Sequence, residues 1–281
     1  MAGVQTLHSY RDLGYLSFFF KSECQTPPEC YLRALFENEI PMSVPQWLSR
    51  TELLTGKEKL LALREKHVLV AGLGGVGAMA AEQICRAGVG CMTIIDGDTV
   101  HPSNRNRQLA ALKSTEGIAK TEVMARRLLD INPELQLTVI YEYMKDDRTI
   151  EILEQGYDYV VDAIDTLSPK VFFLFHCVRL GLPVVSSMGA GGKYDPMQVA
   201  VADINDSYNC KLAYYIRKRL HKMGVWTGIK VIFSPEVVER SSVILQEGES
   251  NKKSNVGTIS YMPAIFGCFC ASVVLRDLLE K

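Results

Sequence analysis

The sequence predicts an α/β protein of the Rossmann-like class, with a doubly wound, mostly parallel sheet and flanking helices. Two observations support this prediction. A short apolar run at residues 68–71 leads into a glycine-rich turn and then a helix-forming segment, as a buried parallel strand leads into a nucleotide-binding helix. Apolar strand-like runs then alternate with helical stretches, which is typical of βαβ units.

The expected elements follow this alternation along the chain. We predict strands over residues 68–71, 92–95, 136–141, 159–163 and 183–187. We predict helices over residues 58–64, 120–130 and 170–180, one directly after the glycine run, and one between residues 141 and 159. Two later segments, residues 197–203 and 228–233, are predicted to be strands of a less regular half.

The C-terminal segment, residues 261–279, is apolar enough to suggest a membrane span. Its charge-free part is too short for a comfortable crossing. Pro263 suits the first turn of a helix, and Arg276 and Asp277 interrupt the far end. We therefore expect a buried C-terminal helix that covers the sheet, and no stable membrane insertion.

Length and composition are those of a single globular unit. With 281 residues, of which 47% are hydrophobic, the chain can bury a full core without splitting into domains. We predict one domain over residues 42–281. Residues 1–41 show no clear periodicity and are predicted to be either a poorly ordered extension or an upstream start assigned in error.

The glycine run predicts a nucleotide site. Gly72, Gly74 and Gly77 have the G-x-G-x-x-G spacing, and Gly75 lies between them. Glycines there allow a tight turn and bring backbone N–H groups to a phosphate, which the N-terminus of the next helix then faces. Asp96 ends the following strand, where an acid can bind ribose hydroxyls. The spacing alone would also fit a nicotinamide-dependent dehydrogenase.

The loop that follows argues for a triphosphate instead. Residues 96–108 are rich in polar groups: Asp96, Asp98, Asn104, Arg105, Arg107 and Gln108. Lys120, near the start of the next helix, adds a cation. Backbone and helix dipole largely satisfy a dinucleotide's pyrophosphate, whereas a triphosphate carries about two further charges and favours planar, bidentate arginine contacts. The sequence therefore favours ATP over NAD.

Together these motifs resemble the ubiquitin-activating-type adenylating enzymes, which include the activators of the sulfur carriers of molybdopterin and thiamine synthesis. The glycine run, the pattern D-x-D-x-V-x-x-x-N-x-x-R-Q and the pattern G-x-x-K stand in that superfamily's order. Within it, the chain looks most like the tRNA threonylcarbamoyladenosine dehydratases. The points of likeness lie at residues 49–54, 131–133, 159–165, 189–192 and 195–196.

The resemblance implies a role for single residues. Asp96 would hold the ribose, with Gly72, Gly74, Gly75 and Gly77 around the nucleotide. Asn104, Arg107 and Lys120 would contact the phosphates and stabilise charge as it moves onto leaving pyrophosphate. Gln108 belongs to the same nucleotide-binding set.

Further roles implied by the resemblance concern a metal and a second subunit. Asp165 matches the acid that positions Mg²⁺, whereas Asp162 is interpreted as structural. Asp98 either assists the metal or shapes its loop. Arg50 matches an arginine that reaches the neighbouring subunit's triphosphate, so a homodimer is expected.

The implied activity is ATP-dependent cyclisation of threonylcarbamoyladenosine beside the anticodon of tRNA. The free carboxylate of the modified base attacks the α-phosphate of ATP, giving an acyl adenylate and pyrophosphate. The neighbouring carbamoyl group then attacks the activated carbonyl, closing a ring and expelling AMP. Because the nucleophile is intramolecular, the reaction requires no protein cysteine.

Two other functions remain as alternatives. A sulfur-carrier or ubiquitin-like-protein activating enzyme would use the same site on a protein's C-terminal carboxylate. The sequence has no C-x-x-C pair, so no zinc is predicted. Cys210 is the one cysteine placed where a thioester nucleophile is expected, but a buried or incidental thiol is the favoured interpretation. A non-enzymatic nucleotide-binding scaffold is the second alternative, although the catalytic charges are all retained. A sulfur-transfer partner stays open.

The location and the RNA-binding surface are weaker predictions. Eight cysteines without framework spacing, and no evident secretory signal, favour a reducing cytoplasm. The net charge of −1 gives no whole-chain signature of nucleic-acid binding. The best local candidate is residues 211–222, a basic helix that is either a tRNA contact or an ordinary solvated face.

Overall fold

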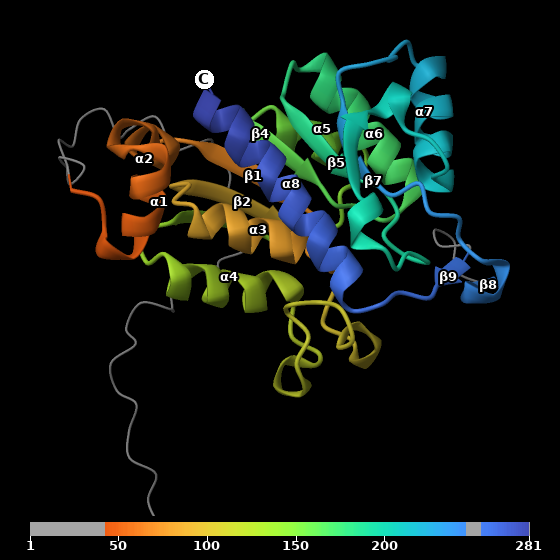
Figure 1. Cartoon of the computed structure of the whole chain (residues 1–281), viewed down its shortest axis with the longest axis horizontal. Helices are drawn as coiled ribbons and strands as arrows, with labels where there is room; N and C mark the ends of the chain where they lie inside the picture. The colour runs from red at the N-terminus through yellow and green to blue at the C-terminus, as the bar shows by residue number, and fades with distance from the viewer. Residues whose placement is uncertain (1–42, 246–253, 281) are drawn as a thin grey trace, which may run out of the picture. The chain divides into compact units, whose positions relative to one another are not determined.

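A computed structural model describes residues 43–245 and 254–280 of the chain (Figure 1). Residues 44–281 belong to one compact unit. The predicted extension over residues 1–41 lies outside the described residues.

Seven strands form the central sheet, in the order β3-β2-β1-β4-β5-β7-β6. Their bounds are β1 (His67–Ala71), β2 (Cys91–Ile95), β3 (Gln136–Ile140), β4 (Tyr159–Asp162), β5 (Val184–Ser187), β6 (Ala200–Asp203) and β7 (Lys230–Phe233). All neighbours pair in parallel except β6, which runs antiparallel to β7. The predicted doubly wound, mostly parallel sheet is therefore confirmed.

Helices cover both faces of this sheet, and a small hairpin lies outside it (Figure 1). The helices are α1 (Ser49–Thr55), α2 (Lys57–Arg64), α3 (Gly77–Arg86), α4 (Lys120–Ile131), α5 (Asp146–Leu153), α6 (Leu167–Arg179), α7 (Lys211–Lys222) and α8 (Tyr261–Glu280). The hairpin consists of β8 (Val243–Leu245) and β9 (Ser254–Val256), which pair antiparallel.

The alternation of side chains along β1 divides the core in two. Val68 and Val70 pack in one cluster with residues of α3, α4 and α8. Leu69 and Ala71 pack in the other, with residues of α5, α6 and α7. Successive residues of a strand point to opposite faces, so a strand covered by helices on both faces must be apolar throughout. This requirement explains the continuous apolar run that predicted β1.

Helix α8 is, among the described residues, the one helix long and apolar enough to cross a membrane by length and composition. Half of its most apolar stretch is buried within the protein. A Cβ added at Gly267 would lie 2.5 Å from the backbone oxygen of Val76 and 2.7 Å from the Met79 Cβ, so α8 and α3 pack closely at this point. As predicted, the C-terminal segment forms a helix that covers the sheet.

Several predicted boundaries were wrong. Helix α6 begins at Leu167 rather than residue 170, because Pro169 lies in its first turn, where a proline costs no helical hydrogen bond. The segment expected as a strand over residues 197–203 begins as a 3₁₀ turn at Pro196–Gln198, and only Ala200–Asp203 pairs. Helix α1 was not predicted, and it buries none of its own residues.

A polar contact ties α8 to two strands. The Asp277 carboxylate accepts hydrogen bonds from the Tyr159 hydroxyl at 2.7 Å and from the Lys230 ammonium at 2.6 Å. Burial alone would raise the pKa of Asp277, but the bonds from Lys230 and Tyr159 outweigh it, and the pKa is lowered. A lowered carboxyl pKa stabilises the fold above the unfolded-state value, and this stabilisation is lost as pH falls through the folded-state value.

We predict that Asp277→Asn lowers the free energy of unfolding at pH 7 by about 1 kcal/mol, a modest loss because Lys230 is half exposed. The difference from wild type should shrink as pH falls below the ordinary carboxyl pKa of 3.8. Urea unfolding monitored by circular dichroism across this range measures it. Glu280→Gln, at an exposed position on the same helix, is the control, and a difference independent of pH would contradict the assignment.

Candidate active site at the carboxyl edge of the sheet

The turn between β1 and α3 is built against the end of β4. Gly72 has a φ of +89°, and an added Cβ there would lie 2.8 Å from the carbonyl oxygen of Ala163. A Cβ at Gly77 would lie 1.8 Å from the carbonyl oxygen of Gly72. Both positions therefore require glycine for the fold itself.

The two middle glycines differ from each other. A Cβ at Gly75 would lie 2.7 Å from the Pro263 side chain of α8. A Cβ at Gly74 would meet nothing closer than the Gln108 side-chain nitrogen, at 3.9 Å. The fold therefore has no packing reason for glycine at residue 74, and the space above it is open to a ligand. No side chain caps the N-terminus of α3, which begins beside this space.

Asp96 connects the glycine turn to the loop after β2. Its carboxylate accepts hydrogen bonds from the backbone N–H groups of Leu73, at 2.6 Å, and Asp98, at 2.7 Å. Burial raises the pKa of Asp96, against the opposing effects of Lys120 and of these two backbone bonds. The carboxylate is thus held at the C-terminal end of β2, next to the glycine turn.

Lys120 and Asp98 form a pair beside Asp96. The buried Lys120 ammonium lies 2.7 Å from one Asp98 oxygen and 4.0 Å from Asp96. The other Asp98 oxygen accepts a hydrogen bond from the Tyr143 hydroxyl at 2.7 Å, and this bond raises the pKa of Tyr143 to about 12. Asp98 thus shapes its loop through these contacts, whichever further role it has.

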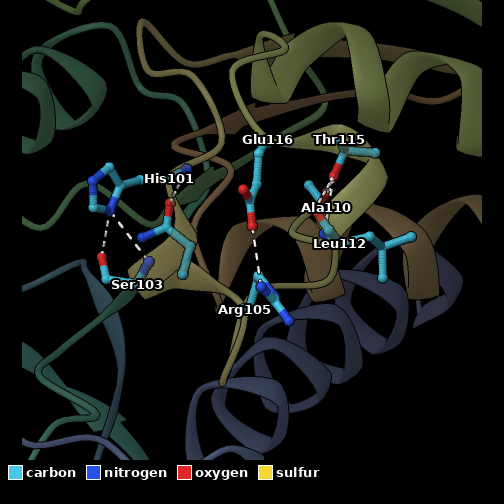
Figure 2. A network of polar contacts seen from close by, with 8 residues as sticks. His101, Ser103, Arg105, Ala110, Leu112, Thr115 and Glu116 are labelled. Atoms are coloured by element: carbon cyan, nitrogen blue, oxygen red, sulfur yellow. Dashed lines mark hydrogen bonds and ion pairs between the residues drawn. The ribbon is translucent and has the colours of Figure 1, made fainter.

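The loop that carries Asn104 and Arg107 is stabilised by local hydrogen bonds, several of which Figure 2 shows. The His101 backbone N–H donates to the Asn104 side-chain oxygen at 3.0 Å, and Arg105 pairs with Glu116 at 3.2 Å. The Arg107 guanidinium donates to the carbonyl of Ser103, at 2.9 Å, and to the Asn106 side chain, at 2.7 Å. Unlike Arg105, Arg107 forms no ion pair with a carboxylate in the described part of the chain.

Gln108 has an unsatisfied polar atom. Its side-chain oxygen is buried and has no hydrogen-bond partner among the described residues. A buried polar atom without a partner costs about 1–3 kcal/mol, so such an atom in a native fold requires an explanation. Its side-chain nitrogen is the atom nearest to the open space at Gly74, which places Gln108 at the same site.

Two acids lie at the C-terminal end of β4, Asp162 within the strand and Asp165 after it, and they differ in environment. Asp162 is fully buried and bound by Lys170, at 2.8 Å, by the Ser186 hydroxyl, at 2.6 Å, and by the Ile164 N–H, at 3.1 Å. These contacts make Asp162 structural, as interpreted from the sequence. Asp165 is exposed and follows directly after the Ala163–Ile164 peptide that contacts Gly72. It therefore lies at the same edge as the glycine turn.

Arg50 is not brought to this edge within one chain. It is exposed on α1, two residues after Leu48, whose side chain packs at Gly88 beyond the C-terminal end of α3. The glycine turn is at the opposite end of α3, about 15 Å away by helical rise. Within one chain, Arg50 therefore does not lie beside the glycine turn.

Tyr143 was missed by the sequence analysis. A Cβ at Gly97 would lie 2.7 Å from its ring, so the aromatic side chain lies flat against the loop between Asp96 and Asp98. The ring comes from the segment after β3, far along the chain. Tyr141 and Tyr143, at and just past the end of the predicted strand 136–141, were the available signal.

Comparisons with known proteins agree with this geometry. The tRNA threonylcarbamoyladenosine dehydratase of Bacillus subtilis is 37% identical over 239 residues, covering 83% of this chain and 94% of that protein. The enzyme of the same name from Escherichia coli is 36% identical, covering 82% of this chain and 92% of that protein.

A solved structure extends the likeness to three dimensions. The crystal structure of the Escherichia coli tRNA N6-threonylcarbamoyladenosine dehydratase TcdA in complex with ATP superposes with a TM-score of 0.76 at 34% identity. The match covers 84% of this chain and 95% of that one. The ThiF family matches residues 48–281 of the sequence. The chain therefore belongs to the ThiF family.

Proposed function

We propose that this protein catalyses the ATP-dependent cyclisation, by dehydration, of N6-threonylcarbamoyladenosine next to the anticodon of tRNA. The observation that carries the proposal is the convergence of Asp96, Lys120, Arg107 and the open glycine turn at one edge of the sheet. The nearly full-length likeness to dehydratases supports the choice of substrate. Residues 42–281 are proposed to be the single adenylating domain.

The glycine turn fits a nucleotide polyphosphate. No described atom of the fold lies closer than 3.9 Å to a Cβ placed at Gly74, so the space above it is open. No side chain caps the N-terminus of α3. A helix N-terminus offers free N–H groups and a positive dipole end to an anion. The side-chain nitrogen of Gln108 is the atom nearest to this space, and an amide nitrogen donates hydrogen bonds, which suits the oxygens of a nucleotide.

The charged side chains are proposed to contact different parts of the nucleotide. Asp96, held by two backbone N–H groups, is proposed to accept hydrogen bonds from the ribose hydroxyls with its remaining lone pairs. Arg107 and Lys120 are proposed to turn from their present partners toward the phosphates, assisted by Asn104. Cations at the leaving pyrophosphate stabilise the charge that develops there.

Asp165 is the residue proposed to hold Mg²⁺. It is a carboxylate at the end of a strand, and oxygen ligands are those that Mg²⁺ prefers. When bound, the ion would neutralise phosphate charge and orient the α-phosphate for attack. Asp162 is already bound by Lys170 and Ser186 and is not proposed as a ligand.

Ring closure requires activation of the carboxylate and little else. A carboxylate is a poor electrophile, and adenylation makes its carbonyl attackable by the neighbouring carbamoyl group of the same nucleotide. Proximity supplies that nucleophile. Cys210 is buried at the start of α7, so it is proposed to be structural rather than catalytic.

Adenylation of a sulfur-carrier or ubiquitin-like protein is the alternative. It would use the same nucleotide residues on a protein's C-terminal carboxylate, so the nucleotide site alone does not distinguish the two. The absence of a C-x-x-C pair in the sequence favours the dehydratase. The proposed reaction needs no sulfur-transfer partner. The proposed location is a reducing cytoplasm.

A homodimer is proposed because Arg50 lies away from its own chain's site. On the same helix, Leu53 and Leu54 are 83% and 87% exposed. Exposed apolar side chains that lie together on a surface are suited to an interface. A second copy covering α1 would bury them and carry Arg50 toward the neighbouring triphosphate.

The first prediction tests the reaction itself. Purified protein, ATP and Mg²⁺ should remove one water from the threonylcarbamoyladenosine of tRNA and release AMP, as measured by mass spectrometry of nucleosides. Arg107→Ala should lower the rate about 100-fold, because a charge stabiliser is lost. Arg105→Ala, which removes a neighbouring arginine paired with Glu116, should stay within about threefold.

Two results would contradict this prediction. If wild type binds ATP but leaves the nucleoside unchanged, the dehydratase proposal is wrong and carrier-protein adenylation becomes the better reading. If both arginine variants lose activity equally, the specific role of Arg107 is wrong.

A second prediction separates nucleotide binding from folding at the glycine turn. Gly74→Ala should weaken ATP binding at least about tenfold and leave the free energy of unfolding nearly unchanged, because only a ligand occupies the space above Gly74. Gly77→Ala should lower the free energy of unfolding by about 3 kcal/mol, through collision with the Gly72 carbonyl. Calorimetric titration with ATP and urea unfolding measure the two effects. A Gly74→Ala protein that binds ATP with wild-type affinity would show that the nucleotide does not lie above Gly74.

A third prediction concerns the second subunit. Arg50→Ala and Arg107→Ala should each be nearly inactive alone, yet mixing and re-equilibrating them should restore activity to about one quarter of wild type. Half of the dimers are then mixed, and each mixed dimer has one intact site of two. Failure of the mixture to gain activity would mean that Arg50 does not act across a dimer.

A further inference from the structure

One face of α7 carries both cations and aromatic rings. Lys211, Tyr214, Tyr215, Lys218 and Lys222 recur at helical spacing, and all are exposed. The opposite face buries Ala213, Ile216 and Leu220 in the core. The exposed stripe is therefore a single surface, about 16 Å long from the first lysine to the last.

The aromatic residues of this surface are unusually open. Tyr214 and Tyr215 are 49% and 52% exposed, and Trp226, just beyond the helix, is 59% exposed. The Trp226 ring stacks on His221 with ring centroids 4.1 Å apart, so it is held in place with its other side available. Exposed, fixed rings are platforms on which nucleic-acid bases stack.

The lysines of this surface are not neutralised. None of the ion pairs between described residues involves Lys211, Lys218 or Lys222. Helix α7 itself contains no acidic residue. The cations of α7 that do have partners are Arg217, which binds the Ile204 and Ser207 carbonyls, and Arg219, which binds Ser168.

The helix leads to the proposed active edge. The Leu212 side chain lies 4.0 Å from the Cβ position of Gly189, two residues after β5 ends at that edge. The C-terminal end of α7 lies toward the other edge. Gly228, six residues after α7, donates a hydrogen bond from its backbone N–H to the Asp203 side chain at 2.7 Å, and β6 ends at Asp203. In Figure 1, α7 lies alongside α6 on the outside of the sheet. A strand bound along α7 would thus run toward the carboxyl edge.

We propose that this face of α7, with Trp226, binds the RNA of the tRNA substrate along a path that leads to the nucleotide being modified. The inference rests on the proposed function. Lysines contact the phosphates, and the tyrosines and Trp226 stack unpaired bases, which are what a tRNA anticodon loop exposes. An acidic protein would match the lysines but leaves the exposed rings unexplained, so RNA is the partner to which the surface is assigned.

The test is tRNA binding as a function of salt. Lys218→Ala/Lys222→Ala should weaken binding about tenfold and lower the slope of log affinity against log salt by about 1 to 2, because each lost phosphate contact removes nearly one counterion. Lys57→Ala/Lys59→Ala, which removes the same charge from exposed positions of α2, is the matched control and should leave both quantities unchanged. Trp226→Ala should weaken binding about tenfold, and Trp226→Phe should restore most of it.

The outcomes separate this inference from the proposed function. ATP binding and urea unfolding at wild-type values establish that the variants are folded. If wild type converts the nucleoside while the α7 variants bind tRNA with wild-type affinity and salt slope, the α7 assignment is overturned and the proposed function stands. If wild type neither binds tRNA nor converts the nucleoside, both are overturned.

Discussion

The close approach of the glycine turn to the end of β4 is the contact on which the site depends. Gly72 adopts a φ of +89° with the Ala163 carbonyl in the place where a Cβ would be. Because of this contact, the N-terminus of α3 and the peptide before Asp165 share one edge of the sheet. Lys170 and Ser186 fix Asp162 in turn, so the strand that presents Asp165 cannot shift without breaking a buried ion pair. The carboxyl edge is therefore rigid where the nucleotide is proposed to bind.

The charges at this edge are held in a paired state. Lys120 is nearly inaccessible to solvent yet lies against Asp98 and near Asp96, and an unpaired ammonium so buried would be costly. Asp98 thus supplies the countercharge for Lys120 when no nucleotide is present. An incoming phosphate would compete with Asp98 for Lys120, while Tyr143 keeps Asp98 hydrogen-bonded. In the proposed reaction, a phosphate of ATP would thus replace the Asp98 carboxylate as the anion beside Lys120.

What the sequence predicted well is local, and what it missed is not. The strand at residues 68–71, the glycine turn and the polar loop over residues 96–108 are short, contiguous patterns whose geometry follows from neighbouring residues. Tyr143 contacts Gly97 and Asp98 only because β2 and β3 are adjacent, and no local pattern encodes that. Helix α1 escaped prediction because it buries none of its own residues. The role of Arg50 was expected from the family resemblance alone, since it depends on a second chain.

The chemistry proposed for this edge needs cations and a bound nucleotide, and it needs no cysteine nucleophile. Described thiols in the core are made poor nucleophiles by burial, which raises the pKa of Cys85 and of Cys270 to about 12, and Cys210 is buried at the start of α7. An enzyme that passes an activated acyl group to its own cysteine would need the opposite environment. When the nucleophile belongs to the substrate, the protein has only to bind the phosphates, stabilise the leaving pyrophosphate and hold the nucleotide in place. Arg107, Lys120 and the exposed rings of α7 are suited to those three tasks.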